Sequence, residues 1–104
     1  MAATIVLVED HELLRRGTQQ AIEADATLRV VGEAGDGEAG LKLIQRELPD
    51  LAIVDLGLPR LSGFELIQQV VLLVPCCRII VLSQHAELNM VDAAFRAGAS
   101  GYLL

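Results

Sequence analysis

Four polar side chains follow short hydrophobic runs in this chain: Glu9, Asp10, Asp55 and Ser83. Three of them are carboxylates, and carboxylates that are brought together repel one another unless a cation lies between them. Oxygen ligands of this kind, with room left for water, suit Mg²⁺. A carboxylate beside Mg²⁺ can attack phosphorus to form an aspartyl phosphate, and a neighbouring hydroxyl can hydrogen-bond a phosphoryl oxygen. The four residues are therefore a candidate site for phosphoryl transfer, provided that the fold gathers them.

Taken one at a time, these residues also have purely structural interpretations. Asp10 could cap the helix that follows it, because a side-chain oxygen at that position accepts a hydrogen bond from a free backbone N–H. Ser83 could simply occupy a turn. The chemical interpretation therefore depends on whether the ends of separate strands meet.

Hydrophobic runs alternate with helix-like stretches along the whole chain. The runs expected to form buried strands are residues 4–8, 28–33, 51–54, 78–82 and 101–104. Between them, apolar residues at spacings of three and four predict four helices. Strands that alternate with helices in this way form an α/β fold, a parallel sheet with helices on both faces. Ligands of such sheets bind at the carboxyl ends of the strands, where the four polar residues are expected.

Capping signals mark the ends of two predicted helices. Asp36 is expected to cap the second helix, over residues 37–48, and Pro49 closes it. Ser62 and Glu65 form a capping-box pattern at the start of the third helix. These signals support the predicted alternation of strands and helices.

Apolar spacing also predicts which helix faces are buried. The residues expected to mark these faces include Leu14, Ala21 and Ile22 in the first helix and Leu88, Val91 and Phe95 in the fourth. Gly98 is expected to end the fourth helix. The apolar run over residues 70–74 is expected to be core, with a contact surface as the alternative.

Composition excludes several classes of protein. The chain has 104 residues, 53% of them hydrophobic, and a formal net charge of -6. This length predicts a single domain, residues 1–104. No apolar run approaches the roughly 18–20 residues of a membrane span, and no basic region suggests a signal peptide, so we expect a cytoplasmic protein. The acidic balance argues against direct nucleic-acid binding, which needs clustered Lys and Arg. The adjacent Cys76 and Cys77 are expected to be free thiols, because neighbouring cysteines fit disulfide geometry poorly, and to serve as small buried hydrophobic residues in a reducing cytoplasm.

Several stretches of the sequence carry a resemblance to a known family: residues 5–11, 54–59 with Gly63, 81–83 and 97–104. In this order, and at the ends of predicted strands, they resemble the receiver domain of a bacterial two-component response regulator. The Asp-His pair after the first strand and the ending Gly-Ala-Ser-Gly-Tyr-Leu-Leu are most similar to the branch that carries a LuxR-type helix-turn-helix.

The resemblance implies a fold and a function. The fold is flavodoxin-like (CheY-like), a doubly wound sheet of five parallel strands in the order 2-1-3-4-5. The function is that of a signalling module that receives a phosphoryl group on Asp55 from a sensor histidine kinase, in a Mg²⁺-dependent reaction, and then switches a transcriptional output. No separate substrate turnover is implied, so the module is not expected to be an enzyme.

The resemblance also implies roles for the remaining site residues. The Mg²⁺ ligands, direct or through water, are Glu9, Asp10, Asp55 and the backbone carbonyl of Gly57. Ser83 would contact the phosphoryl group and shift when it arrives. Tyr102 would be the switch aromatic, changing its exposure as Ser83 moves.

The end of the chain departs from the family pattern. Receivers of this kind carry a lysine after the last strand, which here would follow Leu104, and the one lysine present, Lys42, lies in the second predicted helix. The resemblance therefore implies a truncated receiver without its fifth helix and without a DNA-binding output domain. The apolar surface left uncovered favours a homodimer or other self-association. The alternative function is a degenerate receiver that acts only as a protein-interaction or dimerisation module.

Weaker patterns compete with this interpretation. Residues 35–40 match G-x-G-x-x-G, but they follow the second strand and the chain is short for a dinucleotide-binding fold, which favours a flexible turn. His11 and His85 could be metal ligands or general bases, although surface roles are favoured. A hydrolase built on Ser83 and His85 lacks the nucleophile elbow. A phosphatase that uses Asp55 as its nucleophile is a further alternative.

Overall fold

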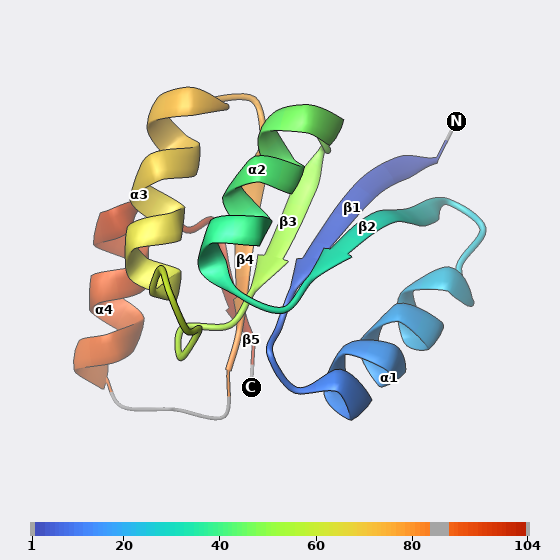
Figure 1. The fold of residues 1–104 in the computed structure, drawn as a ribbon, viewed down its shortest axis with the longest axis horizontal. Helices are drawn as coiled ribbons and strands as arrows, with labels where there is room; N and C mark the ends of the chain where they lie inside the picture. Colours follow the sequence, from blue (N-terminus) through green and yellow to red (C-terminus); the bar gives the residue numbers. More distant parts are fainter. Residues whose placement is uncertain (1, 84–87, 104) are drawn as a thin grey trace.

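The computed structural model describes residues 2–83 and 88–103. Within them, the strands of a single sheet are β1 (Ala3–Val8), β2 (Leu28–Ala34), β3 (Leu51–Val54), β4 (Arg78–Leu82) and β5 (Gly101–Leu103). Neighbouring strands are all parallel, and their order is β2-β1-β3-β4-β5 (Figure 1). The predicted α/β fold and its strand order are confirmed.

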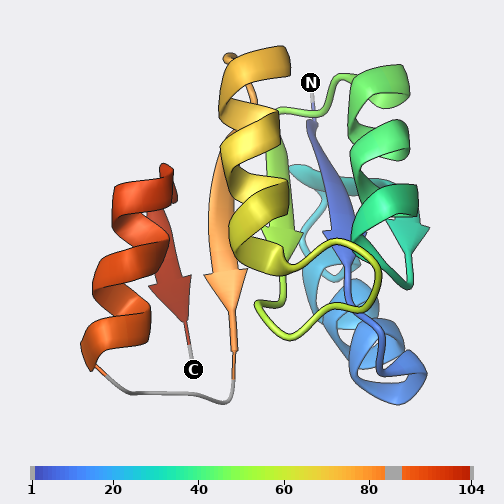
Figure 2. The ribbon, with the colours of Figure 1, turned by 60° about the vertical axis from the view of Figure 1, so that its left-hand side comes forward.

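Helices connect successive strands: α1 (Glu12–Glu23), α2 (Gly37–Glu47), α3 (Gly63–Leu73) and α4 (Leu88–Ala97). Helices α2, α3 and α4 lie side by side, whereas α1 packs apart from them against β1 and β2 (Figures 1 and 2). Within β1, Leu7 lines a small cavity beside Thr18 of α1. The next residue, Val8, lies so close to Gly40 of α2 that an added Cβ would fall 2.7 Å from a Val8 methyl. Because successive strand side chains point to opposite faces, β1 is apolar on both.

The core consists of aliphatic side chains from the central strands and from α2 and α3. The largest of those that are fully buried are Ile5, Val6, Leu7, Val8, Ile44, Val54, Leu66, Ile67, Val70, Ile79 and Val81. Burial of each such side chain stabilises the fold by about 1.5–3 kcal/mol relative to an exposed one. The strand ends are therefore held by a close-packed frame.

Both predicted capping residues act as expected. The side chain of Asp36 accepts a hydrogen bond from the backbone N–H of Ala39 at 2.8 Å. The hydroxyl of Ser62 accepts one from the backbone N–H of Glu65 at 3.2 Å. Each cap fixes the residue at which its helix leaves the loop near the carboxyl ends of the strands.

Helix α2 ends one residue earlier than predicted. Its last helical residue is Glu47, and Leu48 follows in a left-handed conformation with φ 47° and ψ 56°. Pro49 lacks the backbone N–H that would continue the helix. Leu48 is consequently exposed and does not belong to the core face.

Helix α1 differs most from expectation, because none of its residues is buried. Its apolar residues Leu14, Ala21 and Ile22 line an open groove of about 620 Å³, together with Leu82 and Leu103. Hydrophobic spacing correctly predicted an amphipathic helix here. Burial of its apolar face requires a second partner besides the sheet, and the described residues do not supply one.

The apolar faces of α3 and α4 are only partly as predicted. Among the described side chains of α4 the buried one is Ala94, whereas Phe95, which marks the apolar face of the predicted helix, is 47% exposed. The side chain of Leu88 lies outside the described part of the chain. At the end of α3, Val70 and Val74 are buried, while the three residues between them are exposed. The run over residues 70–74 is therefore core at its two ends and surface at the three residues between them.

No helix within residues 2–83 and 88–103 is long and apolar enough to cross a bilayer.

Candidate functional site

Three neighbouring strands end at the same level of the sheet. Val8 at the end of β1 pairs with Val54 of β3, which pairs with Val81 of β4. The backbone N–H of Asp55 continues this ladder by donating to the carbonyl of Val8 at 3.1 Å. The predicted site residues follow directly at this edge: Glu9 and Asp10 after β1, Asp55 after β3 and Ser83 after β4.

Four of the side chains at this edge form one cluster. A ligand atom from each of Glu9, Asp10, His11 and Asp55 lies within 4.8 Å of every other. The fold therefore brings together the three carboxylates singled out in the sequence and adds His11, which had been the weaker candidate. A cluster dominated by carboxylate oxygens fits a hard divalent cation such as Mg²⁺, which takes carboxylate and water ligands.

Glu9 is the buried member of this cluster, with 8% of its surface exposed. Its Oε1 accepts hydrogen bonds from the backbone N–H of His11 at 2.9 Å and from the ring at Nδ1, which lies 2.7 Å away. Burial raises the pKa of the Glu9 carboxyl, the two hydrogen bonds from His11 oppose that rise, and the charge of Asp55 adds to it. In return, the hydrogen bond to Glu9 raises the pKa of the His11 imidazole, and the charge of Asp10 raises it further. The site thus carries a high density of negative charge.

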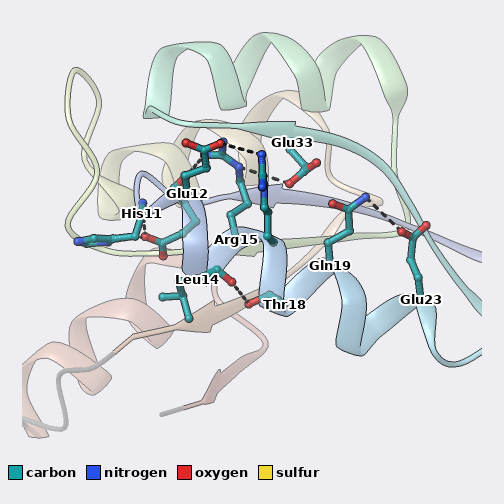
Figure 3. Close-up of polar contacts among 10 residues, drawn as sticks. His11, Glu12, Leu14, Arg15, Thr18, Gln19, Glu23 and Glu33 are labelled. Atoms are coloured by element: carbon teal, nitrogen blue, oxygen red, sulfur yellow. Dashed lines mark hydrogen bonds and ion pairs between the residues drawn. The ribbon is translucent and has the colours of Figure 1, made fainter.

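The side chain of Arg15 on α1 bonds to the chain at the end of β1, a role that sequence analysis missed. Its NH1 donates to the backbone carbonyl of Glu9 at 2.6 Å, and its Nε lies 3.4 Å from a carboxylate oxygen of Glu33 on β2. Figure 3 shows the Arg15 side chain rising from α1 beside Glu33. The guanidinium thereby links α1 to the end of β1 and to β2, next to the acidic cluster. An arginine at helical spacing looks like any solvated residue, so no sequence signal marked it.

The loop after Asp55 is held against the start of α3. The backbone N–H of Gly63 donates to the carbonyl of Leu56 at 3.0 Å. A Cβ added at Gly63 would overlap the backbone carbonyl of Asp55, so the close approach requires glycine. Gly57, the predicted source of a carbonyl ligand, is exposed, and a Cβ there would lie 3.9 Å from Oδ2 of Asp55.

Ser83 and Tyr102 occupy the β4–β5 side of the same edge. Ser83 is buried, and its backbone N–H donates to the carbonyl of Leu103 at 3.0 Å. Tyr102 pairs with Val81 and is partly buried against the core. The two predicted switch residues are therefore joined through adjacent strands.

Two structural alternatives from the sequence can now be decided. The N-cap residue of α1 is His11, without a side-chain cap, so the capping role considered for Asp10 is wrong. In the G-x-G-x-x-G pattern, Gly37 packs against the carbonyl of Leu61 and Gly40 against Val8. Both glycines lie in α2 and allow it to pack closely, so they do not form a flexible turn. Their packing gives no support to dinucleotide binding. His85 lies outside the described residues.

The two cysteines are free thiols, as predicted. Cys77 is buried as expected, but Cys76 is exposed, so its expected burial is wrong. Burial raises the pKa of the Cys77 thiol to about 11. Neither belongs to the acidic cluster.

Comparison with known proteins identifies similar sequences. The family profile described as the response regulator receiver domain matches residues 5–104. The nitrate/nitrite response regulator NarL of Escherichia coli (strain K12) is 39% identical over 102 residues, or 98% of this chain. The transcriptional activator protein ExaE of Pseudomonas putida is 39% identical over 99 residues, or 95% of this chain. The chain spans 47% and 46% of the lengths of these two relatives.

Solved structures are similar as well. The signal receiver domain of NarL from Mycobacterium tuberculosis matches with a TM-score of 0.96 and 36% identity, covering 99% of this chain and 83% of that one. A two-component response regulator of the LuxR family from Aurantimonas sp. SI85-9A1 matches with a TM-score of 0.93 and 34% identity, covering 98% of this chain and 73% of that one. The likeness thus extends over nearly the whole chain.

Proposed function

Because this chain belongs to the response regulator receiver domain family, near its LuxR branch, we propose that Asp55 is the residue on which it accepts a phosphoryl group. A phosphoryl-accepting signal receiver is the function of the family, and it is favoured over a degenerate interaction module. The observation that carries the assignment of Asp55 is its position directly after β3, within 4.8 Å of the ligand atoms of Glu9 and Asp10.

In the proposed reaction, a carboxylate oxygen of Asp55 attacks the phosphorus of a phosphohistidine on a sensor histidine kinase. The P–O bond forms as the P–N bond breaks, and the histidine nitrogen leaves with the electron pair and takes up a proton. The chain contributes a well-positioned nucleophile, because Asp55 is hydrogen-bonded through its backbone to Val8 and packed against Gly63. A regulator that keeps the phosphoryl group on its own side chain needs no separate substrate turnover.

The cation of this site is proposed to be Mg²⁺, held directly or through water. Its ligands would be Glu9, Asp10, Asp55 and the backbone carbonyl of Gly57. Carboxylates within 4.8 Å of one another support this assignment, since their mutual repulsion needs a compensating positive charge. When bound, Mg²⁺ would offset the negative charge of the carboxylates and of the incoming phosphoryl oxygens.

Ser83 is proposed to hydrogen-bond the phosphoryl group and to shift when it arrives. Tyr102 is proposed to respond by changing its exposure. Their positions support this coupling, since Ser83 directly follows β4 and its backbone N–H donates to the carbonyl of Leu103, the neighbour of Tyr102 on β5. A local charge at Asp55 would then alter the β4–β5 surface.

The partners of the whole protein are proposed from its relatives. The donor would be a sensor histidine kinase. The chain spans less than half of the length of transcriptional relatives, so we propose a DNA-binding output in the rest of the protein and a cytoplasmic location. Nucleic acid would bind there and not to this acidic receiver.

Self-association is proposed through the open groove beside α1. Its lining in the described part of the chain is apolar apart from Thr18 and Asp25, and Leu13 within it is 85% exposed. A second copy would bring the same leucines to a symmetric contact and so cover both grooves at once.

The phosphoryl-accepting function can be tested by incubating the chain with acetyl phosphate and Mg²⁺ and measuring its intact mass. We expect one phosphoryl adduct, lost in Asp55→Asn and in excess EDTA. Asp92→Asn on α4 is the matched control, because it removes an exposed carboxylate away from the cluster and should leave the adduct intact. An adduct that persists in Asp55→Asn would contradict the assignment, and continuous hydrolysis of a phosphomonoester would favour a phosphatase.

A further inference from the structure

The side chain of His11 makes a specific contact that the proposed reaction does not use. Its Nδ1 lies 2.7 Å from Oε1 of Glu9 and 3.2 Å from Oδ1 of Asp10. The remainder of the ring projects into solvent, since 71% of the side chain is exposed. Core packing therefore does not explain why the ring adopts this orientation.

Two hydrogen bonds from His11 converge on one oxygen of Glu9. The backbone N–H contributes the first at 2.9 Å and the ring the second. An ionised carboxylate can only accept, so Nδ1 carries the proton in this contact. Because both hydrogen bonds use Oε1, neither occupies the second oxygen of the Glu9 carboxylate. Glu9 is thereby oriented while it keeps an oxygen for a cation.

We propose that His11 is a positioning residue for the divalent cation site: its ring N–H orients the buried carboxylate of Glu9 so that the carboxylate can bind the metal. This inference rests on the proposed function, in that it requires Glu9 to be a metal ligand. Hydrogen-bonding partners of metal ligands fix ligand orientation, and their removal commonly costs about 10–100-fold in metal affinity.

The competing assignment is that His11 binds the cation itself, because one of its ring nitrogens belongs to the cluster. His11 cannot fill both roles through Nδ1 at once, since a nitrogen that donates its proton to Glu9 has no lone pair for a metal. The hydrogen bond of 2.7 Å favours positioning.

An isosteric pair of variants tests the hydrogen-bond donor at position 11. In His11→Asn the amide nitrogen is attached to Cγ, as Nδ1 is in histidine, and can still donate to Glu9. His11→Leu has the same shape as the asparagine variant but no donor. Because the His11 side chain is exposed, both variants should fold. Far-UV circular dichroism and thermal melting in EDTA check this.

A matched control exists at the other end of the sheet. Oδ1 of Asp25 accepts from the backbone N–H of Thr27 at 2.9 Å and from its hydroxyl at 2.7 Å, the same pattern and the same distances as at Glu9. Thr27→Val removes the side-chain donor there. Any loss of Mg²⁺ affinity that is caused by general weakening of the fold should appear in this variant too.

The measurement is titration of Mg²⁺ alone into the unphosphorylated chain, followed by backbone amide NMR shifts. We expect similar dissociation constants for wild type, His11→Asn and Thr27→Val, and about tenfold weaker binding for His11→Leu. Equal binding by His11→Leu and wild type would overturn the inference, and so would an asparagine variant as weak as the leucine variant. Failure of the proposed metal site itself looks different, because wild type would then bind no Mg²⁺ or Glu9→Gln would bind it equally well.

Discussion

Gly63, the first residue of α3, packs directly against the backbone carbonyl of Asp55. A Cβ at this position would overlap that carbonyl and the Cα of Leu56. The N–H of Gly63 also donates to the carbonyl of Leu56 at 3.0 Å. The proposed phosphoryl acceptor is therefore held by contact with a helix that is itself packed in the core.

This contact predicts that Gly63→Ala destabilises the chain by about 1–3 kcal/mol, because the backbone on either side must separate to admit the methyl group. Urea unfolding measures the change, and the rate of adduct formation with acetyl phosphate should fall as well. Gly17→Ala in α1 is the control. A Cβ at Gly17 meets nothing within 4 Å, so alanine should stabilise that helix by up to about 1 kcal/mol. Equal stability of the two variants would contradict the packing argument.

Arg15→Ala is expected to lower the free energy of unfolding by about 1.5–3 kcal/mol, since it removes a charge-assisted hydrogen bond to the carbonyl of Glu9 and the ion pair with Glu33. Arg15→Lys should restore only part of this loss, because an ammonium cannot serve both partners with the planar geometry of a guanidinium. Arg16→Ala should change stability by less than about 0.5 kcal/mol, since its ion pair with Glu12 is exposed. The prediction is wrong if the two alanine variants unfold at the same urea concentration.

Metal removal should reveal the repulsion within the acidic cluster. In EDTA, Asp10→Asn is expected to melt above wild type, because one of three mutually repelling charges is gone, an effect of the order of 1 kcal/mol. Added Mg²⁺ should stabilise wild type more than the variant, since a cation stabilises the state that binds it. Calorimetry in EDTA and in Mg²⁺ measures both effects. A variant that melts lower than wild type in EDTA would show that the cluster is not strained.

The two thiols should differ in reactivity. Burial raises the pKa of Cys77 to about 11, so at a pH of about 8.5 only roughly 0.3% of it is thiolate, against roughly a quarter of a thiol at the usual pKa of 9.0. Native protein treated with iodoacetamide should gain one adduct, on Cys76, and a second only after unfolding in urea. Because the folded state retains a proton that the unfolded state releases, this thiol lowers stability as pH rises from 9.0, its usual pKa, towards 11. Two adducts formed at equal rates on native protein would refute the assignment.

The proposed self-association through the α1 groove can be tested by light scattering across a range of concentrations. Leu13→Glu places a charge in the groove and should shift the chain towards monomer. Leu72→Glu on α3 is the matched control, a leucine outside the groove that is 75% exposed, and it should leave association unchanged. A wild-type chain that is monomeric at every concentration would contradict the proposal.

Much of the site was predictable because sequence periodicity and parallel topology are linked. Apolar runs such as residues 51–54 are buried strands, and the residue after each run must lie at the carboxyl edge of the sheet. Glu9, Asp10 and Asp55 therefore had to meet once the strands were parallel and adjacent. Caps such as Asp36 were predictable because they depend on residues only three positions apart.

Other features depend on contacts between distant segments and were not predictable. Phe95 and Leu14 have the spacing of buried residues, yet both remain exposed because an apolar face is buried only where another element packs on it. The clamp from Arg15 to Glu9 and Glu33 depends on how α1 sits against two strands.

The sequence alone thus determined the order of strands and helices, the acidic residues at the strand ends and the chemistry that those residues favour. These follow from local periodicity and from the restricted topology of parallel sheets. Only the tertiary structure decided that the His11 ring contacts Glu9, that Gly63 must approach Asp55 without a side chain, and that α1 keeps an open apolar groove. Such contacts depend on side-chain rotamers and on the packing of whole elements, which sequence periodicity does not encode.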